Sequence, residues 1–199
     1  GLAAESLMHF GKAAALKPLN PRASLLYGQQ LLAMGQTDAA QAALEHVLMV
    51  DPGQPYAHAT LALIDAQAGA RASAQEHIAA ALRRDPQNIG IRLVEAKVYR
   101  SLDDPEMIVE RLGPLTKAQR ANPGVAFELA WAWNKLGRPR PAAEAWINLF
   151  NASPTHPDAW QWARDAAIGL NEAGDQVAAQ AWQRQAEMLA PRESALEDQ

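Results

Sequence analysis

The chain has 199 residues, a formal net charge of −4, 49% hydrophobic residues and no cysteine. The acidic balance argues against nucleic acid as a partner, which needs clustered Lys and Arg, and a chain without cysteine forms no disulfide and no thiolate metal site. No run approaches the roughly 18 apolar residues of a membrane span, so we expect no direct membrane insertion.

The most informative feature is a set of residue types that returns every 34 positions. A large apolar residue, a proline and a glycine each follow this interval. Such a period is the signature of stacked repeat proteins. The prolines of the pattern are Pro18, Pro52, Pro86 and Pro154, and its glycines are Gly35, Gly69 and Gly137, with Asp103 at the missing step.

The pattern begins with half a unit. Residues 1–20 contain an apolar stripe from Leu2 to Lys17 that matches the second helix of a unit, with no first helix before it. A second helix without its mate leaves an apolar flank uncovered. We therefore expect the chain to be a segment of a larger protein.

Residues 21–54 form the clearest full unit. Pro21 favours a helix start, Gly35 a left-handed helix end, and Asp38 a cap on the second helix. Small residues at Gly28 and Ala40 predict a close approach of the two helices. The second helix carries a buried stripe and ends before proline, through Ala40, Leu44, Val47 and Asp51-Pro52.

The later units repeat this plan with two departures. Residues 55–88 and 123–156 keep the pattern, whereas 89–122 is degenerate: its second helix is expected to start at Asp104-Pro105 and to break at Gly113-Pro114, because an internal proline removes a helical hydrogen bond. Residues 157–191 are stretched, since Gly137 and Gly174 are 37 positions apart. We expect an extra helical turn near 155–162, a polar tail at 192–199, and eleven helices in all.

These positions resemble the tetratricopeptide repeat (TPR) family, whose unit is a 34-residue helix–turn–helix. The resemblance implies an all-α, right-handed superhelical solenoid of stacked antiparallel helix pairs. The family set of small, Gly, Ala, large apolar, small or apolar and Pro reads Gly28, Gly35, Ala40, Leu44, Val47, Pro52; then Ala62, Gly69, Ala74, Ile78, Ala81, Pro86; and then Ala130, Gly137, Ala142, Trp146, Leu149, Pro154.

Residue patterns typical of enzymes are lacking in the sequence. The five histidines show no zinc-binding spacing, no serine elbow or phosphate loop is present, and we expect no catalytic residue, metal or cofactor. Paired carboxylates facing a cavity would instead suggest a helical-toroid hydrolase. Glu128 and Asp165 are the only candidates for such a pair that the groove-facing phase offers.

In the family, the first helices of successive units line a concave groove. Residues in that phase predict a largely apolar groove with two cations near its middle, suited to a partner's amphipathic helix or extended segment. Trp133 and Trp146 fall on buried positions, whereas Trp131 either faces the groove or packs between helices. The predicted partner-binding residues are Leu25, Gln29, Tyr56, Leu63, Leu93, Lys97, Arg100, Phe127 and Trp131.

The resulting functional hypothesis is a non-catalytic protein-interaction scaffold with a protein or peptide partner, in a larger bacterial protein or assembly. Bacterial proteins that resemble this chain commonly serve envelope assembly, including polysaccharide and pilus machinery. The alternative is a regulatory or substrate-recruiting arm of an enzyme whose catalytic domain lies outside these residues. Periplasm and cytoplasm both stay open, as does the oligomeric state.

Overall fold

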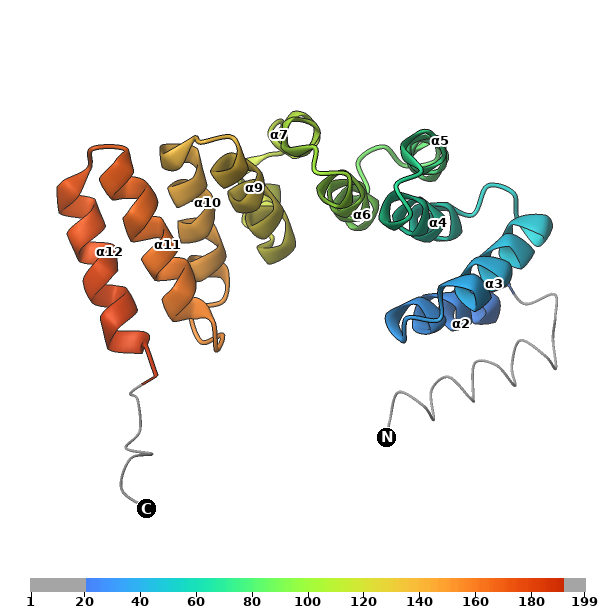
Figure 1. Cartoon of the computed structure of the whole chain (residues 1–199), viewed down its shortest axis with the longest axis horizontal. Coiled ribbons are helices and arrows are strands. Elements are labelled where there is room, and N and C mark those ends of the chain that lie inside the picture. The colour runs from blue at the N-terminus through green and yellow to red at the C-terminus, as the bar shows by residue number, and fades with distance from the viewer. Residues whose placement is uncertain (1–20, 192–199) are drawn as a thin grey trace, which may run out of the picture. The chain divides into compact units, whose positions relative to one another are not determined.

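The computed structural model describes residues 21–191, which form eleven helices and no strand (Figure 1). The chain divides between Asp103 and Asp104 into two compact units, whose described parts are residues 21–103 (unit 1) and 104–191 (unit 2). The division separates the two helices of the degenerate repeat. The helix expected at Leu2–Lys17 and the tail at 192–199 lie outside the described residues.

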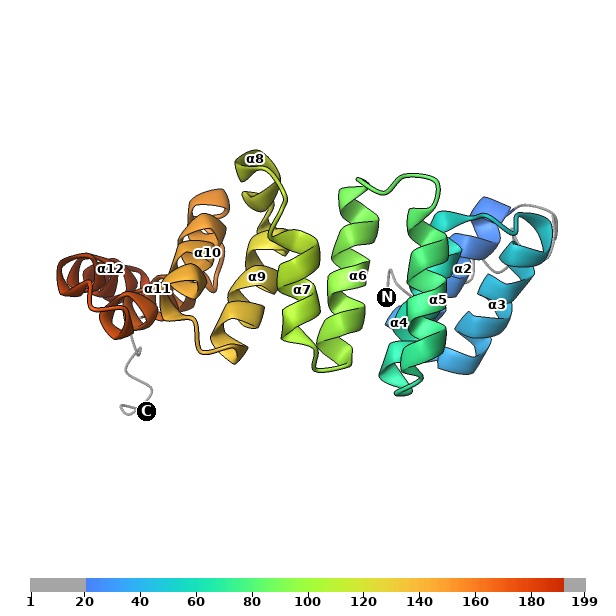
Figure 2. The ribbon, with the colours of Figure 1, turned by 90° about the horizontal axis from the view of Figure 1, so that it is seen from above.

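Unit 1 consists of two complete helical hairpins and a fifth helix. The helices are α2 (Pro21–Ala33), α3 (Thr37–Val50), α4 (Pro55–Gln67), α5 (Arg71–Leu82) and α6 (Ile89–Ser101). The expected stripe of α3 is fully buried, with 0% exposure at Ala40, Leu44 and Val47. A second core cluster joins α4, α5 and α6, which lie next to one another in Figure 2. Stacking therefore buries the stripes that one hairpin leaves open.

Unit 2 contains the remaining six helices. They are α7 (Pro105–Leu112), α8 (Lys117–Arg120), α9 (Pro123–Lys135), α10 (Pro139–Ala152), α11 (Ala159–Glu172) and α12 (Gln176–Leu189). Trp146 is 7% exposed and lies in the core of this unit, as the repeat pattern predicts. Gly169 of α11 packs tightly on α10, since a Cβ there would lie 2.7 Å from the Pro139 carbonyl oxygen.

The turns inside the hairpins share one backbone conformation. The four turn glycines, which are the three pattern glycines and Gly174 of the stretched repeat, have positive φ, from 62° at Gly137 to 82° at Gly174. Asp103, which occupies the same phase, has φ 49° and is the only non-glycine residue with positive φ in residues 21–191. Aspartate tolerates the left-handed region better than most residues. The degenerate repeat therefore keeps the turn geometry without the glycine.

The predicted break in the degenerate repeat is confirmed. Asp104 caps α7 by accepting a hydrogen bond from Met107 N at 3.3 Å, and Pro105 is the first helical residue. The helix ends at Leu112, before Gly113-Pro114, and Thr116 starts α8 with a capping box. The expected total of eleven helices counted one in residues 1–20 and two in each of the five later units. The break adds one helix to these five units, so residues 21–191 alone contain eleven.

Two local predictions are wrong. Asp38 does not cap α3, because the helix already begins at Thr37 and places Asp38 in its first turn. The stretch in the last repeat adds no helical turn: α10 ends at Ala152, α11 starts at Ala159, and residues 153–158 form a loop. Pro157 disfavours the helical region for the residue before it. Most of the extra length is therefore in the loop.

The predicted close approach of α2 and α3 is confirmed at Gly28. A Cβ there would lie 2.9 Å from Leu44 Cγ and 3.3 Å from the Ala40 carbonyl oxygen. We expect Gly28→Leu to lower the free energy of unfolding by about 1–3 kcal/mol, the usual cost of overpacking. Because a stacked array sums nearest-neighbour terms, faster amide exchange should stay within α2–α4. Equal loss of protection in α10–α12 would contradict this locality.

Candidate functional site

The first helices of the repeats in unit 1 form one connected face. Gln29 Nε2 of α2 donates to Thr60 Oγ1 of α4 at 3.5 Å. The phenol oxygen of Tyr56, at the start of α4, lies 3.5 Å from the place a Cβ of Gly90 would take on α6. Leu63 of α4 and Val94 of α6 both pack on the same core cluster. The first-helix face of unit 1 is therefore made by α2, α4 and α6.

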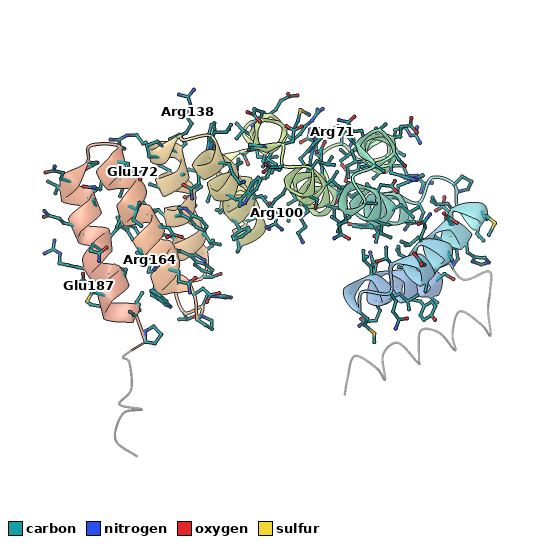
Figure 3. All side chains as sticks on the ribbon, in the orientation of Figure 1. Arg71, Arg100, Arg138, Arg164, Glu172 and Glu187 are labelled. Atoms are coloured by element: carbon teal, nitrogen blue, oxygen red, sulfur yellow. The ribbon has the colours of Figure 1, made fainter. Side chains whose placement is uncertain are left out.

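Most predicted groove residues of unit 1 have accessible side chains. Tyr56 is 40% exposed and Lys97 is exposed, and in Figure 3 the labelled Arg100 lies below α6 while Arg71 lies above it. The partly buried positions are Gln29, Leu63, Leu93 and Arg100. Leu25 is a correction: it is 8% exposed and belongs to the core cluster of α2, α3 and α4, so it does not line an open face.

The predicted residues of unit 2 are half-buried on α9. The ring of Phe127 meets the buried Trp146 edge to face, with centroids 6.0 Å apart. The Lys135 ammonium lies 5.5 Å from the ring centroid of Trp131, one helical turn away. Trp131 thus has a cation over its ring and part of its surface in solvent. Trp133, expected in the core, is only partly buried.

Comparison with known proteins identifies the fold of these helices. Residues 1–64 match the family model described as tetratricopeptide repeat. The structure of PilW, a type IV pilus biogenesis factor, matches 94% of this chain and 90% of its own with a TM-score of 0.72 at 18% identity. The chain has the fold of tetratricopeptide repeat proteins. The match to the family model itself covers residues 1–64.

Other solved structures share the TPR fold at similarly low identity. PilF of Pseudomonas aeruginosa has a TM-score of 0.70 at 20% identity, over 86% of this chain and 77% of its own. YrrB, described as a TPR protein with an unusual peptide-binding site, has a TM-score of 0.64 at 16% identity, over 92% and 93%. A comparison with curated proteins finds no match. At these identities the likeness concerns the fold, which is typical of protein-interaction scaffolds.

The carboxylates considered for a hydrolase do not form an open pair. Glu128 is 2% exposed within α9. Burial raises the pKa of Asp165, an effect opposed by the neighbouring Arg164, whose Nη2 lies 3.7 Å from Asp165 Oδ1. Within residues 21–191 no group of three or more His, Cys, Asp or Glu side chains could hold a metal ion. None of the described helices has the length and apolar character of a membrane span.

One polar cluster of the TPR hairpin α4–α5 was missed by the sequence analysis. His58 Nδ1 and His77 Nδ1 are 2.9 Å apart, and His58 Nε2 is 2.9 Å from the Pro52 carbonyl oxygen. His77 Nε2 lies 3.8 Å from Asp65 Oδ2, to which Ser73 Oγ donates at 2.6 Å. Since His58 Nε2 must donate to a carbonyl, its Nδ1 accepts from His77. The two imidazoles therefore link α4 to α5 across the hairpin.

The cluster predicts a pH dependence of stability. Burial lowers the pKa of His77 below its ordinary value of 6.5, with His58 acting in the same direction and Asp65, Glu76 and Glu45 opposing it. The unfolded chain then binds more protons than the folded one as the pH falls through 6.5, so the free energy of unfolding of unit 1 must decrease. Denaturant titrations at pH 7.5 and pH 5.5 should show this loss, which His77→Gln should reduce. An equal loss in that variant would contradict the assignment.

Proposed function

We propose that this TPR protein is a non-catalytic scaffold that binds a partner protein through the first-helix faces of its repeats. The exposure of Tyr56, at 40%, carries the proposal. A large aromatic side chain is open to solvent beside Gly90, on the face where Lys97 is also exposed. Aromatic residues are enriched at the centres of protein interfaces, so an open tyrosine marks this face as a candidate for binding.

The chemistry of the face selects the kind of segment that fits. Partly exposed Leu63 of α4 and Leu93 of α6 offer shallow apolar contacts, and Lys97 and Arg100 offer two cations on α6. Grooves of this kind recognise spaced apolar anchors of a helix or an extended chain. The partner segment is therefore amphipathic, with apolar anchors and an acidic flank.

The assembly that contains the scaffold is also part of the proposal. One of the proteins with this fold, PilW, is described as a type IV pilus biogenesis factor. Its identity to this chain, 18%, supports the fold and leaves the cellular role open to test. We propose a bacterial cell-envelope assembly as the setting.

The test begins with a partner captured from the native organism and purified. Titration against Tyr56→Ala should give about tenfold weaker binding, because exposed aromatic anchors carry much of an interface's energy. Lys97→Ala should act mainly on the salt dependence of binding, as rim charges do. Glu76→Ala on α5 is the matched control for the second helices. Unchanged affinity for Tyr56→Ala together with loss in the control would place the interface elsewhere.

A further inference from the structure

A second candidate site lies on the other side of α4. Helices α3, α4 and α5 line an open pocket of about 480 Å³, a size typical of binding sites. Leu61 and Asp65 line it from α4, each two residues from a first-helix-face position such as Leu63. Two residues correspond to about 200° around a helix, so the pocket and that face lie on opposite sides of α4.

The lining combines carboxylates with an apolar wall. Glu45 of α3 and Asp65 of α4 contribute the carboxylates, and the described residues that line the pocket include no Lys or Arg. Leu61 is 3% exposed, whereas Met49 is 74% exposed. The full set is Gln41, Glu45, Leu48, Met49, Leu61, Asp65, Ser73 and His77.

Both carboxylates are held by neighbouring side chains. Gln41 Nε2 donates to Glu45 Oε1 at 2.8 Å, one turn apart on α3. Ser73 Oγ donates to Asp65 Oδ2 at 2.6 Å, across the α4–α5 hairpin. Glu45 is exposed, whereas the side chain of Asp65 is 20% exposed and mostly shielded from water. Shielded, oriented carboxylates bind cations more strongly than flexible surface carboxylates do.

We propose that this pocket binds an arginine side chain of a partner protein segment. The guanidinium lies against Asp65 and Glu45, since its planar fork matches carboxylate geometry. The aliphatic stem and the apolar residue beside it pack on Leu61 and Met49, as amphipathic side chains do. This site is separate from the first-helix face. It binds a positive charge, whereas that face is proposed to bind an acidic flank.

Histidine makes this binding sensitive to pH. His77 lies 3.8 Å from Asp65, and its pKa is lowered by burial. At neutral pH it is uncharged and leaves Asp65 available to the ligand. When His77 gains a proton, its charge satisfies Asp65 and competes with the arginine. His58 of α4, Glu76 of α5 and Glu45 of α3 also act on this imidazole.

The test uses the whole chain and the blocked dipeptide acetyl-Leu-Arg-methylamide as probe. Backbone resonances of Glu45, Met49 and Ser73 should shift and saturate at pH 7.5. The citrulline analogue, which keeps the shape and loses the charge, should bind at least about tenfold more weakly. Because this comparison uses the unaltered protein, it does not depend on the folding of a variant. Equal shifts for the two peptides, or shifts that never saturate, would overturn the proposal.

Variants locate the charge that is recognised. Asp65→Asn should weaken binding of the arginine probe about tenfold. Glu144→Gln, an equal change of charge at an exposed residue of α10, should leave it unchanged. Binding of the probe should also weaken between pH 7.5 and 5.5, and His77→Gln should remove that dependence. Equal weakening by Asp65→Asn and Glu144→Gln would show a non-specific charge effect and overturn the site. If partner binding at the first-helix face failed its own test, the result for the arginine probe at this pocket would not change.

Discussion

Glu95→Ala is expected to lower the free energy of unfolding of unit 1 by about 3 kcal/mol, the cost of removing one partner of a buried ion pair. Glu95 is 2% exposed on α6. Its Oε2 lies 2.8 Å from Arg92 Nη1, and the exposed fractions of the two side chains are 3% and 16%. Arg92 Nε also donates to the Pro86 carbonyl oxygen at 2.9 Å. The pair therefore ties α6 to the loop before it.

The loss arises mainly from the charge that is left behind. Replacing both Arg92 and Glu95 by leucine should recover most of the stability, because an apolar pair of similar size needs no compensation. Glu76→Ala, an exposed carboxylate on α5, is the control and should stay within about 0.5 kcal/mol of the wild type. Denaturant unfolding, followed by amide exchange in α6, measures these differences. A Glu95→Ala value close to that of the control would show that the pair contributes little.

Trp131→Ala is expected to weaken partner binding by about 2 kcal/mol, or roughly 30-fold, since tryptophan is among the residues that dominate interface energies. The indole is partly exposed and carries the Lys135 ammonium 5.5 Å from its ring centroid. Removing it takes apolar surface from the first-helix face of unit 2 while the core beneath stays filled. Isothermal titration with the captured partner measures the loss.

Phe127→Ala, on the same helix as Trp131, is expected to affect binding and folding together. Phe127 packs edge to face on buried Trp146, so its removal should lower both partner affinity and the stability of unit 2. Glu144→Ala, at an exposed residue of α10, is the control for both measurements. Wild-type affinity for Trp131→Ala would remove α9 from the binding surface.

The repeat period predicts the helices well because its residues act locally. Prolines start helices, and the turn glycines adopt positive φ. The apolar stripe of α3 is buried because its hairpin stacks on the next one. Even the degenerate repeat follows, since Asp104 and Pro105 start a helix by the same local rules. The extra residues before α11 were placed wrongly because two prolines, Pro154 and Pro157, favour a loop over a longer helix.

Exposure on the first-helix face depends on neighbours that a period does not contain. Leu25 has the phase of a groove residue, yet it is covered in the core of unit 1. Trp133 has the phase of a core residue, yet it is only partly buried. Phase gives the direction of a side chain, and packing decides how much of it remains open.

Contacts across a hairpin could have been found from the sequence. In the sequence, His58 precedes the turn at Gly69 and His77 follows it. Asp65 and Ser73 lie closer to Gly69, at equal separations before and after it. In an antiparallel hairpin such positions face each other. A period of 34 residues relates equivalent positions of successive repeats. It does not relate the positions on either side of one turn, so this signal was missed.

The most direct test of the binding surface is amide hydrogen exchange of the whole chain, with and without the captured partner. We expect binding to slow amide exchange in α4, α6 and α9 and to leave α10 unchanged. The slowed segments should be Tyr56–Leu63, Leu93–Arg100 and Phe127–Trp131. Protection confined to the second helices α3, α5 and α10, with α4, α6 and α9 unchanged, would contradict binding through the first-helix faces.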